Sequence, residues 1–264
     1  MEKDAITFSF GRNWEDFIKT SFSDERVRIA RAHLLDFLEM DDLRGKYFLD
    51  IGCGSGIHSL AALLLGAERV VSFDVDEYSV KAAEMVRERK GRDFDWEILR
   101  GSVLDQDFLS RIEPADIVYS WGVLHHTGDM WRAIENAASR LLPDGLFYIA
   151  LYTTYPKSDY WLEVKKKYNR SSRAGKRMME YSYIARRAVL PDLLNGRNPW
   201  KRVRDHKKGR GMSFMTDVRD WLGGYPFEHA RIEEVLRFGR KSLGLELVNI
   251  KTGEDNTEYL FKGR

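Results

Sequence analysis

Two things are scarce in this sequence of 264 residues: cysteine and long runs of apolar residues. The single cysteine, Cys53, excludes an internal disulfide framework and is typical of a reducing compartment, so we expect a cytoplasmic location. The longest apolar stretch, around residues 59–67, is too short to cross a bilayer, and we expect no transmembrane segment. The first residues carry no basic segment followed by an apolar one, so we expect no signal peptide.

A large net charge is also missing, but the charge is unevenly distributed. The chain has a net charge of +2, whereas residues 156–211 contain 17 Lys or Arg and only 5 Asp or Glu. The rest of the chain holds 26 basic and 36 acidic residues and is therefore acidic. Besides a solvated helical face, this basic segment suits an anionic small substrate, a phospholipid or acyl-carrier surface, or RNA. No recognisable RNA-binding module accompanies it.

The order of apolar segments predicts an α/β fold. Continuous apolar runs are typical of buried parallel strands, and here they alternate with amphipathic helical patterns. The expected strands are Tyr47–Ile51, Val70–Phe73, Trp96–Leu99, Ile117–Trp121 and Leu146–Leu151. The expected helices are Ser59–Leu65, Tyr78–Arg89, Asp107–Ile112 and Met130–Leu142. This alternation indicates a parallel sheet with helices on both faces, and the chain shows no internal repeat.

The N-terminal residues 1–45 read as a helical segment. Ser21 or Ser23 is suited to cap the helix, because a hydroxyl at this position accepts from a free amide of the first turn. An apolar stripe follows at helical spacing, made of Val27, Ile29, Ala30, His33, Leu34, Phe37 and Leu38.

After Tyr152 the strand–helix alternation stops. Residues 153–227 are basic and aromatic and predict a helical cap inserted after the fifth strand. Its expected helices are near 158–169, 174–189 and 215–222. A helix near 230–241 and two strands, 244–251 and 257–262, then form the end of the sheet as an antiparallel hairpin. We therefore expect one domain over residues 1–264.

A glycine loop follows the first expected strand, in the stretch FLDIGCGSGIHSL at residues 48–60. Such a loop lets a ligand approach the main chain at a helix start. The spacing is G-x-G-x-G, whereas dinucleotide sites have G-x-G-x-x-G, and their third glycine would fall at Ile57. Asp50 would repel a pyrophosphate but suits an ammonium group. The loop therefore disfavours a nicotinamide dinucleotide.

The loop resembles motif I of the class I S-adenosylmethionine (SAM)-dependent methyltransferases, D-x-G-x-G-x-G. Other landmarks of that superfamily follow in order: Asp74 after the second strand, Gly101–Val103 after the third, and residues 116–131 around the fourth. The resemblance covers residues 45–152 closely and the last strands loosely. It implies a Rossmann-like, seven-stranded, mostly parallel sheet with the cap after strand five.

The resemblance also implies how the chain holds SAM and its product S-adenosylhomocysteine (SAH). The glycines of the loop shape the methionine site, Asp74 holds the ribose, and Ser102 and Val103 meet the adenine. The full set expected at the cofactor is Asp50, Gly52, Cys53, Gly54, Gly56, Asp74, Val75, Ser102, Val103, Trp121 and Arg12. Ser102 replaces a frequent aspartate, so Asp105 or the main chain is an alternative adenine contact.

Four of these residues also have plainer interpretations. Asp74 suits a turn or a helix cap, Asp50 suits a loop acceptor, and Cys53 suits a small space-filler. Arg12 is either a contact of the SAM carboxylate or a surface arginine.

Two histidines follow the fourth strand, at the carboxyl edge where ligands bind in such sheets. His126 is the first candidate for a base or an acceptor-orienting group, with His125 beside it and Tyr152 as a further acceptor contact. Alternatively, both rings pack around the cofactor and bond to the main chain. Neither a Cys pair nor an H-x-x-x-H pattern is present, and we expect no metal.

We therefore predict a SAM-dependent methyltransferase that acts on an oxygen or nitrogen of a small or medium-sized organic acceptor. The cap supplies candidate substrate contacts: Asp217, Trp221 and Tyr225. Two alternatives stay open, an RNA methyltransferase that uses residues 156–211 and a SAM-binding protein without catalysis. The fourth strand ends in SWGV instead of an N-P-P-Y-type tetrapeptide, which disfavours a DNA-modifying enzyme. The oligomeric state stays open.

Overall fold

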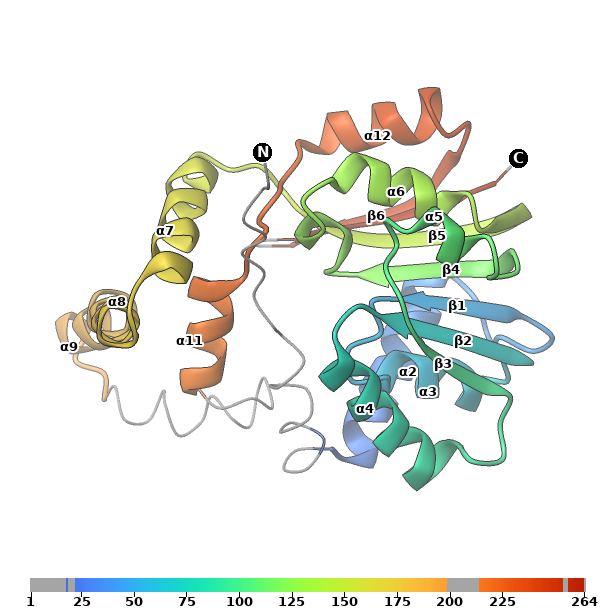
Figure 1. The fold of residues 1–264 in the computed structure, drawn as a ribbon, viewed down its shortest axis with the longest axis horizontal. Coiled ribbons are helices and arrows are strands. Elements are labelled where there is room, and N and C mark those ends of the chain that lie inside the picture. The colour runs from blue at the N-terminus through green and yellow to red at the C-terminus, as the bar shows by residue number, and fades with distance from the viewer. Residues whose placement is uncertain (1–17, 19–21, 199–213, 254–255, 264) are drawn as a thin grey trace.

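The protein is described by a computed structural model that covers residues 18, 22–198, 214–253 and 256–263, except for the side chains of residues 216, 217 and 220 (Figure 1). Its centre is a seven-stranded sheet with the order β3-β2-β1-β4-β5-β7-β6. The strands are β1 (Tyr47–Ile51), β2 (Arg69–Asp74), β3 (Trp96–Arg100), β4 (Ala115–Trp121), β5 (Leu141–Tyr152), β6 (Glu246–Thr252) and β7 (Asn256–Lys262). The first five strands are parallel, and β7 is antiparallel to both β5 and β6. The predicted Rossmann-like fold is confirmed.

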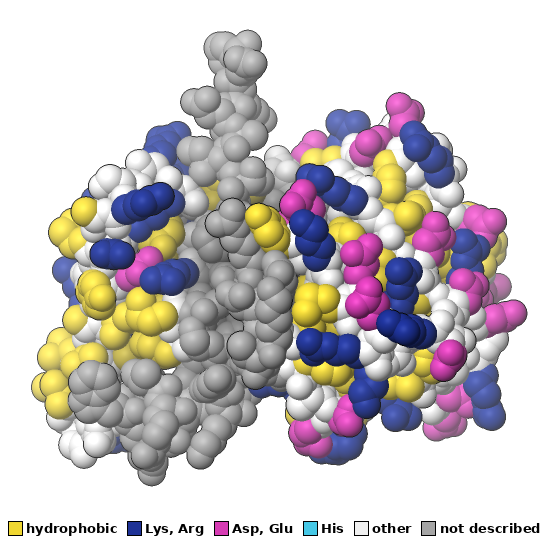
Figure 2. Space-filling model, turned by 60° about the horizontal axis from the view of Figure 1, so that its bottom comes forward, with side chains coloured by type: hydrophobic (Ala, Val, Ile, Leu, Met, Phe, Trp, Pro, Cys, Tyr) yellow, Lys and Arg dark blue, Asp and Glu magenta, His cyan; other side chains and the backbone are white. Residues whose placement is uncertain are grey.

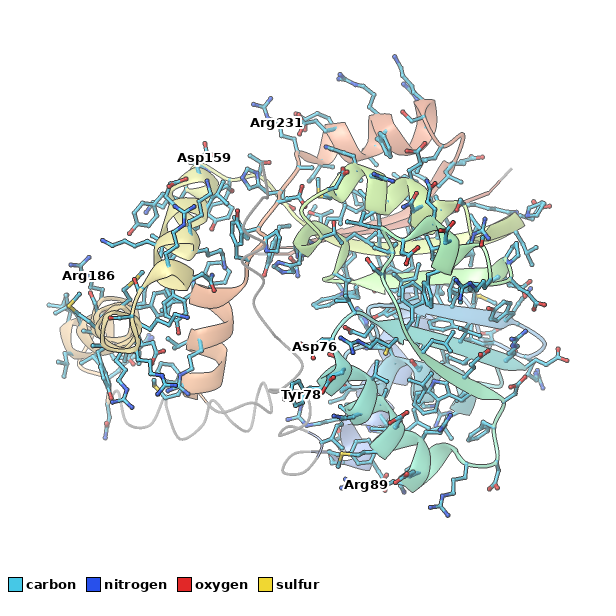
Figure 3. The ribbon with its side chains drawn as sticks, viewed as in Figure 1. Asp76, Tyr78, Arg89, Asp159, Arg186 and Arg231 are labelled. Carbon is cyan, nitrogen blue, oxygen red and sulfur yellow. The ribbon has the colours of Figure 1, made fainter. Side chains whose placement is uncertain are left out.

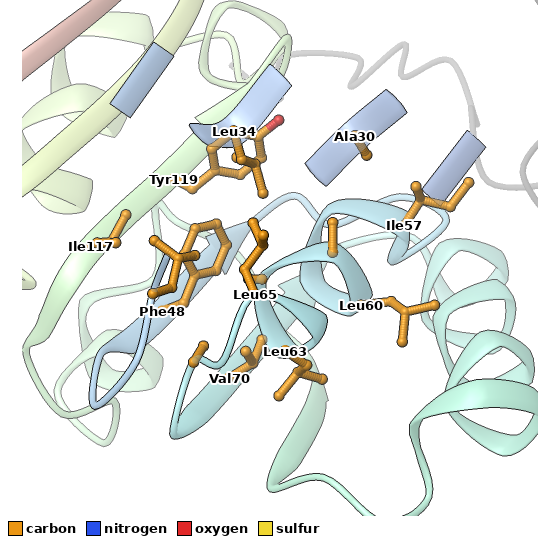
Figure 4. Close-up of a cluster of buried hydrophobic side chains, with 14 of the residues drawn as sticks. Ala30, Leu34, Phe48, Ile57, Leu60, Leu63, Leu65, Val70, Ile117 and Tyr119 are labelled. Carbon is orange, nitrogen blue, oxygen red and sulfur yellow. The ribbon is translucent and has the colours of Figure 1, made fainter. Parts of the chain in front are cut away.

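Helices cover both faces of this sheet because the side chains of each strand alternate between them. In β1, Phe48 packs toward α2 and α3, whereas Leu49 packs toward the opposite helices (Figure 4). One face carries α2 (Asp24–Leu38), α3 (Ile57–Leu64) and α4 (Glu77–Val86), and the other carries α5 (Gln106–Leu109), α6 (Met130–Ala138) and α12 (Ile232–Lys241). The two clusters of apolar side chains fix the sheet between two helical layers.

The helix α2 begins where the sequence predicts it. Ser23 is its N-cap, and the hydroxyl accepts from the Arg26 amide. Most of the predicted stripe is buried, but Ile29 was wrongly included, because its side chain is 56% exposed. The helix ends at Leu38, and Glu39 adopts a left-handed conformation, so the chain is not helical up to residue 45. Residues 1–17 and 19–21 lie outside the described part.

The helix expected at Met130–Leu142 ends earlier, at Ala138. Leu141 already belongs to β5 and pairs with Ala115 of β4. The register between these strands shifts after Ala115, and Asp144 takes a left-handed conformation with φ 60°. Pairing with β4 therefore overrides the helical pattern of the sequence at this junction.

The cap lies to one side of the sheet body in Figure 1. Its described helices are α7 (Ser158–Arg170), α8 (Arg173–Ile184), a π-helical turn (Ala185–Val189), α9 (Leu190–Leu194) and α11 (Phe214–Gly223). Trp161, Tyr168, Val218, Leu222 and Phe227 form a separate apolar core within it. None of the helices in the described ranges is both long and apolar enough to cross a bilayer.

Candidate active site

The glycine loop makes a tight turn between β1 and α3. Gly52 and Gly56 have φ angles of 77° and 73°, which side chains rarely tolerate. A Cβ on Gly52 would collide with the Val123 methyl groups, and a Cβ on Gly56 would lie 2.9 Å from Ala83 Cβ. The amides of Gly52 and Cys53 both donate to the Phe73 carbonyl oxygen, at 2.8 and 3.1 Å. The loop is thus pinned to the end of β2, with no space for a side chain at Gly52 or Gly56.

Asp74 ends β2 and is bonded to this loop. Its Oδ2 accepts from the Gly54 amide at 3.0 Å, and its Oδ1 accepts from the Asp76 amide at 2.9 Å. Burial raises the pKa of Asp74, and the hydrogen bonds from Asp76 and Gly54 oppose that effect. The predicted ribose acid therefore bonds to the glycine loop and begins the turn to Asp76, as one of its plainer interpretations has it, whereas Asp76 and not Asp74 caps α4. Val75 follows it and is 65% exposed.

Asp50 lies beneath the loop at the end of a buried hydrogen-bond chain. Trp96 Nε1 donates to Ser72 Oγ, Ser72 donates to Ser59 Oγ, and Ser59 donates to Asp50 Oδ2 at 2.5 Å. Burial raises the pKa of Asp50 to about 7, although the Ser59 hydrogen bond lowers it. The sequence did not indicate Ser59, Ser72 or Trp96, whose roles depend on contacts between β2, β3 and α3.

The half-buried Cys53 lies within the same loop. Burial raises the pKa of its thiol well above the ordinary value. The nearby carboxylates of Asp50 and Asp74 raise this pKa further. Its thiol is therefore protonated, which supports the role of a space-filler.

The turn after β3 carries the residues predicted to meet adenine. Val103 is buried, and its carbonyl oxygen accepts from Asn136 Nδ2 at 2.9 Å. Ser102 Oγ accepts from the Leu104 amide, and Asp105 caps α5 by accepting from the Phe108 amide at 3.0 Å. Asp105 is therefore engaged as a helix cap.

The two histidines and Tyr152 form one aromatic group at the carboxyl edge. The ring centroids of His125 and Tyr152 are 4.1 Å apart, and those of His126 and Tyr152 are 5.4 Å apart. His126 Nδ1 is 2.6 Å from the Pro226 carbonyl oxygen, so this nitrogen carries the proton. Burial lowers the pKa of His126 to about 4, while the bond to Pro226 opposes the shift. His126 is therefore neutral at physiological pH, with Nε2 as an acceptor.

His125 is buried more completely than its neighbour. Neither of its ring nitrogens has a hydrogen-bond partner among the described residues, and burial lowers its pKa well below the ordinary value. The interpretation in which both rings bond to the main chain therefore holds for His126 alone. On the cap side, buried Lys165 lies near both histidines, with Nζ 4.6 Å from the Trp221 ring centroid and 4.8 Å from that of Phe227. The sequence distinguishes Lys165 only as one of the 17 basic residues of segment 156–211.

The candidate substrate residues are less closely grouped. Trp221 packs within the core of the cap, and its indole nitrogen is buried without a partner in the described structure. Tyr225 is half-buried and precedes Pro226, which holds His126. Asp217 belongs to α11, but its side chain lies outside the described part, as does Arg12 as a whole.

Trp121 reaches a polar cluster that the sequence did not indicate. Its indole Nε1 donates to Glu258 Oε2 at 3.2 Å, and the indole is 41% exposed. Tyr148 donates to the same oxygen, and His33 Nε2 lies 3.1 Å from it. These residues come from β4, β5, β7 and α2. They lie close together because β7 is the neighbour of β5 in the sheet.

Within the part of the chain that the structure describes, no three His, Cys, Asp or Glu side chains are grouped in a way that could hold a metal ion. The carboxyl edge thus carries the glycine turn, the carboxyl groups of Asp50 and Asp74 beside it, and the neutral imidazole of His126. Asp76, labelled in Figure 3, lies on the side of the sheet body that faces the cap.

Comparisons with known proteins agree with this fold. A family model for ribosomal protein L11 methyltransferase (PrmA) matches residues 32–147. The solved structure of PKMT2 from Rickettsia typhi in complex with AdoHcy has a TM-score of 0.59 and 14% identity, and the alignment covers 97% of this chain and 55% of that one. Residues 32–147 thus match a methyltransferase family model, and the fold of the chain is that of the class I SAM-dependent methyltransferases.

Two curated methyltransferases show how far the likeness extends. Ribosomal protein L11 methyltransferase of Tolumonas auensis is 38% identical over 87 residues, which are 33% of this chain and 30% of that protein. Ubiquinone biosynthesis O-methyltransferase of Parvibaculum lavamentivorans is 31% identical over 134 residues, 51% of each chain. The matches thus span about half or less of these relatives. The family model ends at residue 147, before the cap, so it carries no information about residues 153–227.

Proposed function

We propose that this chain binds SAM at the carboxyl edge of β1, β2 and β4 and transfers its methyl group to an oxygen or nitrogen of a small or medium-sized organic acceptor. The observation that supports this most is the hydrogen bond from the Gly54 amide to Asp74, which joins the glycine turn to the acid of the next strand. At Gly52 and Gly56 of this turn the packing leaves no space for a side chain. These features fit an adenosyl ligand with a cationic end.

One group of residues would bind SAM, and another would act on the methyl acceptor. Gly52, Gly54 and Gly56 would shape the methionine site, Asp50 would face its ammonium group, and Asp74 would accept from the ribose hydroxyls. Ser102 and Val103 would meet the adenine. Bound SAM supplies an electrophilic methyl group on a sulfonium. Much of the acceleration in such a transfer comes from alignment of the reactants.

His126 is the candidate that moves a proton. Its Nδ1 is held by the Pro226 carbonyl oxygen, so the ring keeps one orientation and one tautomer. Its Nε2 can accept a proton from a hydroxyl or amine of the acceptor. Tyr152 packs edge-on against this ring and is a further acceptor contact. Trp221, Tyr225 and Asp217 are the proposed substrate contacts from the cap.

The test combines calorimetry with turnover. We expect the full chain to bind SAH and to form SAH from SAM with members of a panel of phenols, carboxylic acids and amines. His126→Ala is expected to change SAM affinity only a few-fold and to lower turnover by roughly 10² or more. His229→Ala is the control, because His229 lies outside this aromatic group. SAM binding without any SAH formed would favour a non-catalytic binder, and unchanged turnover would remove His126 from the reaction.

A further inference from the structure

The outer helices of the cap expose an unusual number of apolar side chains. Leu194 is 78% exposed and Met178 is 70% exposed. Tyr181, Leu190 and Leu193 of the same helical stretch are each more than half exposed. Figure 2 shows apolar and basic side chains mixed on the cap lobe. Single exposed apolar residues are ordinary, but a run of them along one helix marks an interaction surface.

These side chains follow one face of a continuous helix. Met178, Tyr181 and Ala185 are exposed at steps of three and four residues, as on one side of an α-helix. The next exposed apolar residue, Leu190, comes five residues later. That step falls on the π-helical turn Ala185–Val189, in which hydrogen bonds close from i to i+5. The longer turn therefore keeps Leu190 and the other leucines of α9 close to the same face.

The charge exposed on this stretch is positive. Arg173, Arg177, Arg186 and Arg197 are exposed, and Arg186 lies at the outer end of the cap in Figure 3. Both acidic residues between positions 173 and 197 are buried. Glu180 accepts from the Tyr168 hydroxyl at 2.7 Å and from Arg219 Nε at 3.3 Å, and Asp192 is 3% exposed. The acids are turned inward, so the face presents cations and apolar groups together.

We infer that α8 and α9 form a docking face for an anionic phospholipid bilayer, with the helix lying in the plane of the membrane surface. Exposed aliphatic side chains between arginines are what an interfacial helix needs, because its apolar residues enter the lipid boundary while its cations meet the headgroups. RNA would use the arginines and tyrosines, but it offers little to the exposed leucines. This inference is independent of the reaction that the chain catalyses.

Vesicle sedimentation of the full chain tests the inference. We expect binding to vesicles of phosphatidylglycerol and phosphatidylcholine in equal parts, weak binding to pure phosphatidylcholine, and loss of binding as salt rises. Leu193→Gln with Leu194→Gln is expected to weaken binding by roughly ten-fold or more. Arg177→Gln with Arg186→Gln should weaken it to a similar extent. Ile29→Gln, on the exposed side of α2, is the matched control and should bind as the unmodified chain does.

Three results would overturn the inference. The first is no binding to the phosphatidylglycerol vesicles in 0.1 M salt. The second is binding that the leucine substitutions leave unchanged, especially if an RNA oligonucleotide competes for it, because the face would then be a nucleic-acid surface. The third is a dimer of the unmodified chain that the leucine substitutions dissociate, because the face would then join two copies. Circular dichroism of each variant shows that it is folded.

Discussion

Trp121 in β4 and Glu258 in β7 are joined by a hydrogen bond of 3.2 Å across the strand between them. Ala150 of β5 pairs with both residues, and its small side chain lets the indole reach the carboxylate. Because Tyr148 and His33 also approach Glu258 Oε2, this oxygen links three strands and α2 at the carboxyl edge. A half-exposed indole is thereby held in one orientation beside the proposed cofactor site.

Glu258→Gln is expected to lower the free energy of unfolding at pH 7 by about 1.5–3 kcal/mol, since hydrogen bonds to a charged acceptor are strong. Burial raises the pKa of Glu258, but the hydrogen bonds from His33, Tyr148 and Trp121 outweigh burial, and the pKa lies below its usual value. A lowered pKa contributes stability above the unfolded-state value, and that stability is lost as the pH falls through the folded-state pKa. Urea titrations at pH 7 and below pH 4.5 measure both effects.

The matched control is Glu246→Gln, an exposed carboxylate of β6 in the same hairpin. The control should unfold as the unmodified chain does at pH 7. If Glu258→Gln unfolds with the same free energy as the control, Glu258 does not fix this edge of the sheet.

Gly56→Ala is expected to destabilise the protein more than Gly45→Ala does. Both glycines have left-handed backbones, with φ of 73° and 68°, so both substitutions cost about 1–2 kcal/mol for the backbone. Only at Gly56 does the new methyl group collide, with Ala83 Cβ at 2.9 Å and Trp96 Cζ2 at 3.1 Å, whereas Gly45 has open space. Crowding of this kind adds about 1–3 kcal/mol.

Urea titration measures this difference, and calorimetry with SAH measures its effect on the site. The shifted loop should weaken SAH binding in Gly56→Ala while Gly45→Ala binds normally. Equal stability and equal affinity of the two variants would show that the close packing at Gly56 is unimportant.

Much of the sheet was predictable, because parallel strands that are buried on both faces consist of nearly continuous apolar residues. Tyr47–Ile51 was predicted with its observed bounds for this reason. The glycine loop was equally predictable, since its left-handed backbone strongly favours glycine. Ile29 shows the limit of periodicity: it lies within an apolar stripe, yet its side chain faces away from α3 and the sheet.

The polar contacts of the site were not predictable. His33 and Glu258 meet because β7 inserts between β5 and β6, and no local pattern encodes that placement. Lys165 resembles its exposed neighbours in the sequence but is fully buried against Trp221 and Phe227. Such contacts depend on tertiary packing, which a pattern of residue types along one chain does not specify.

Asp50 should release a proton when SAH binds. Its pKa is raised to about 7 by burial, so at pH 6 the carboxyl group is mostly protonated. An ammonium group placed beside it favours the charged form, so up to about one proton should leave per SAH bound at pH 6 and almost none at pH 8.5. Calorimetry in buffers of different ionisation enthalpy counts the protons. Asp50→Asn should abolish the release, while Asp116→Asn at the opposite edge should preserve it. An equal release from Asp50→Asn would place the ammonium group elsewhere.

The buried histidines should make the protein lose stability in mild acid. Burial lowers the pKa of both His58 and His126 to about 4, whereas in the unfolded chain each titrates near 6.5. Between these values the unfolded state binds the additional proton, so the free energy of unfolding falls as the pH drops from about 6.5 toward 4. The loss approaches about 1.4 kcal/mol per pH unit for each histidine.

Urea titrations between pH 7 and pH 4.5 should therefore show a shallower pH dependence for His126→Gln than for the unmodified chain, by about one proton. His58→Gln should flatten the dependence by the same amount, because its pKa is lowered equally although it lies on α3. Asp50 opposes this trend, since its raised pKa adds stability as the pH falls from about 7, so the comparison has to be made between variants that retain Asp50. Parallel curves for His126→Gln and the unmodified chain would mean that folding does not lower the pKa of His126, so the ring would gain its proton in mild acid as it does in the unfolded chain.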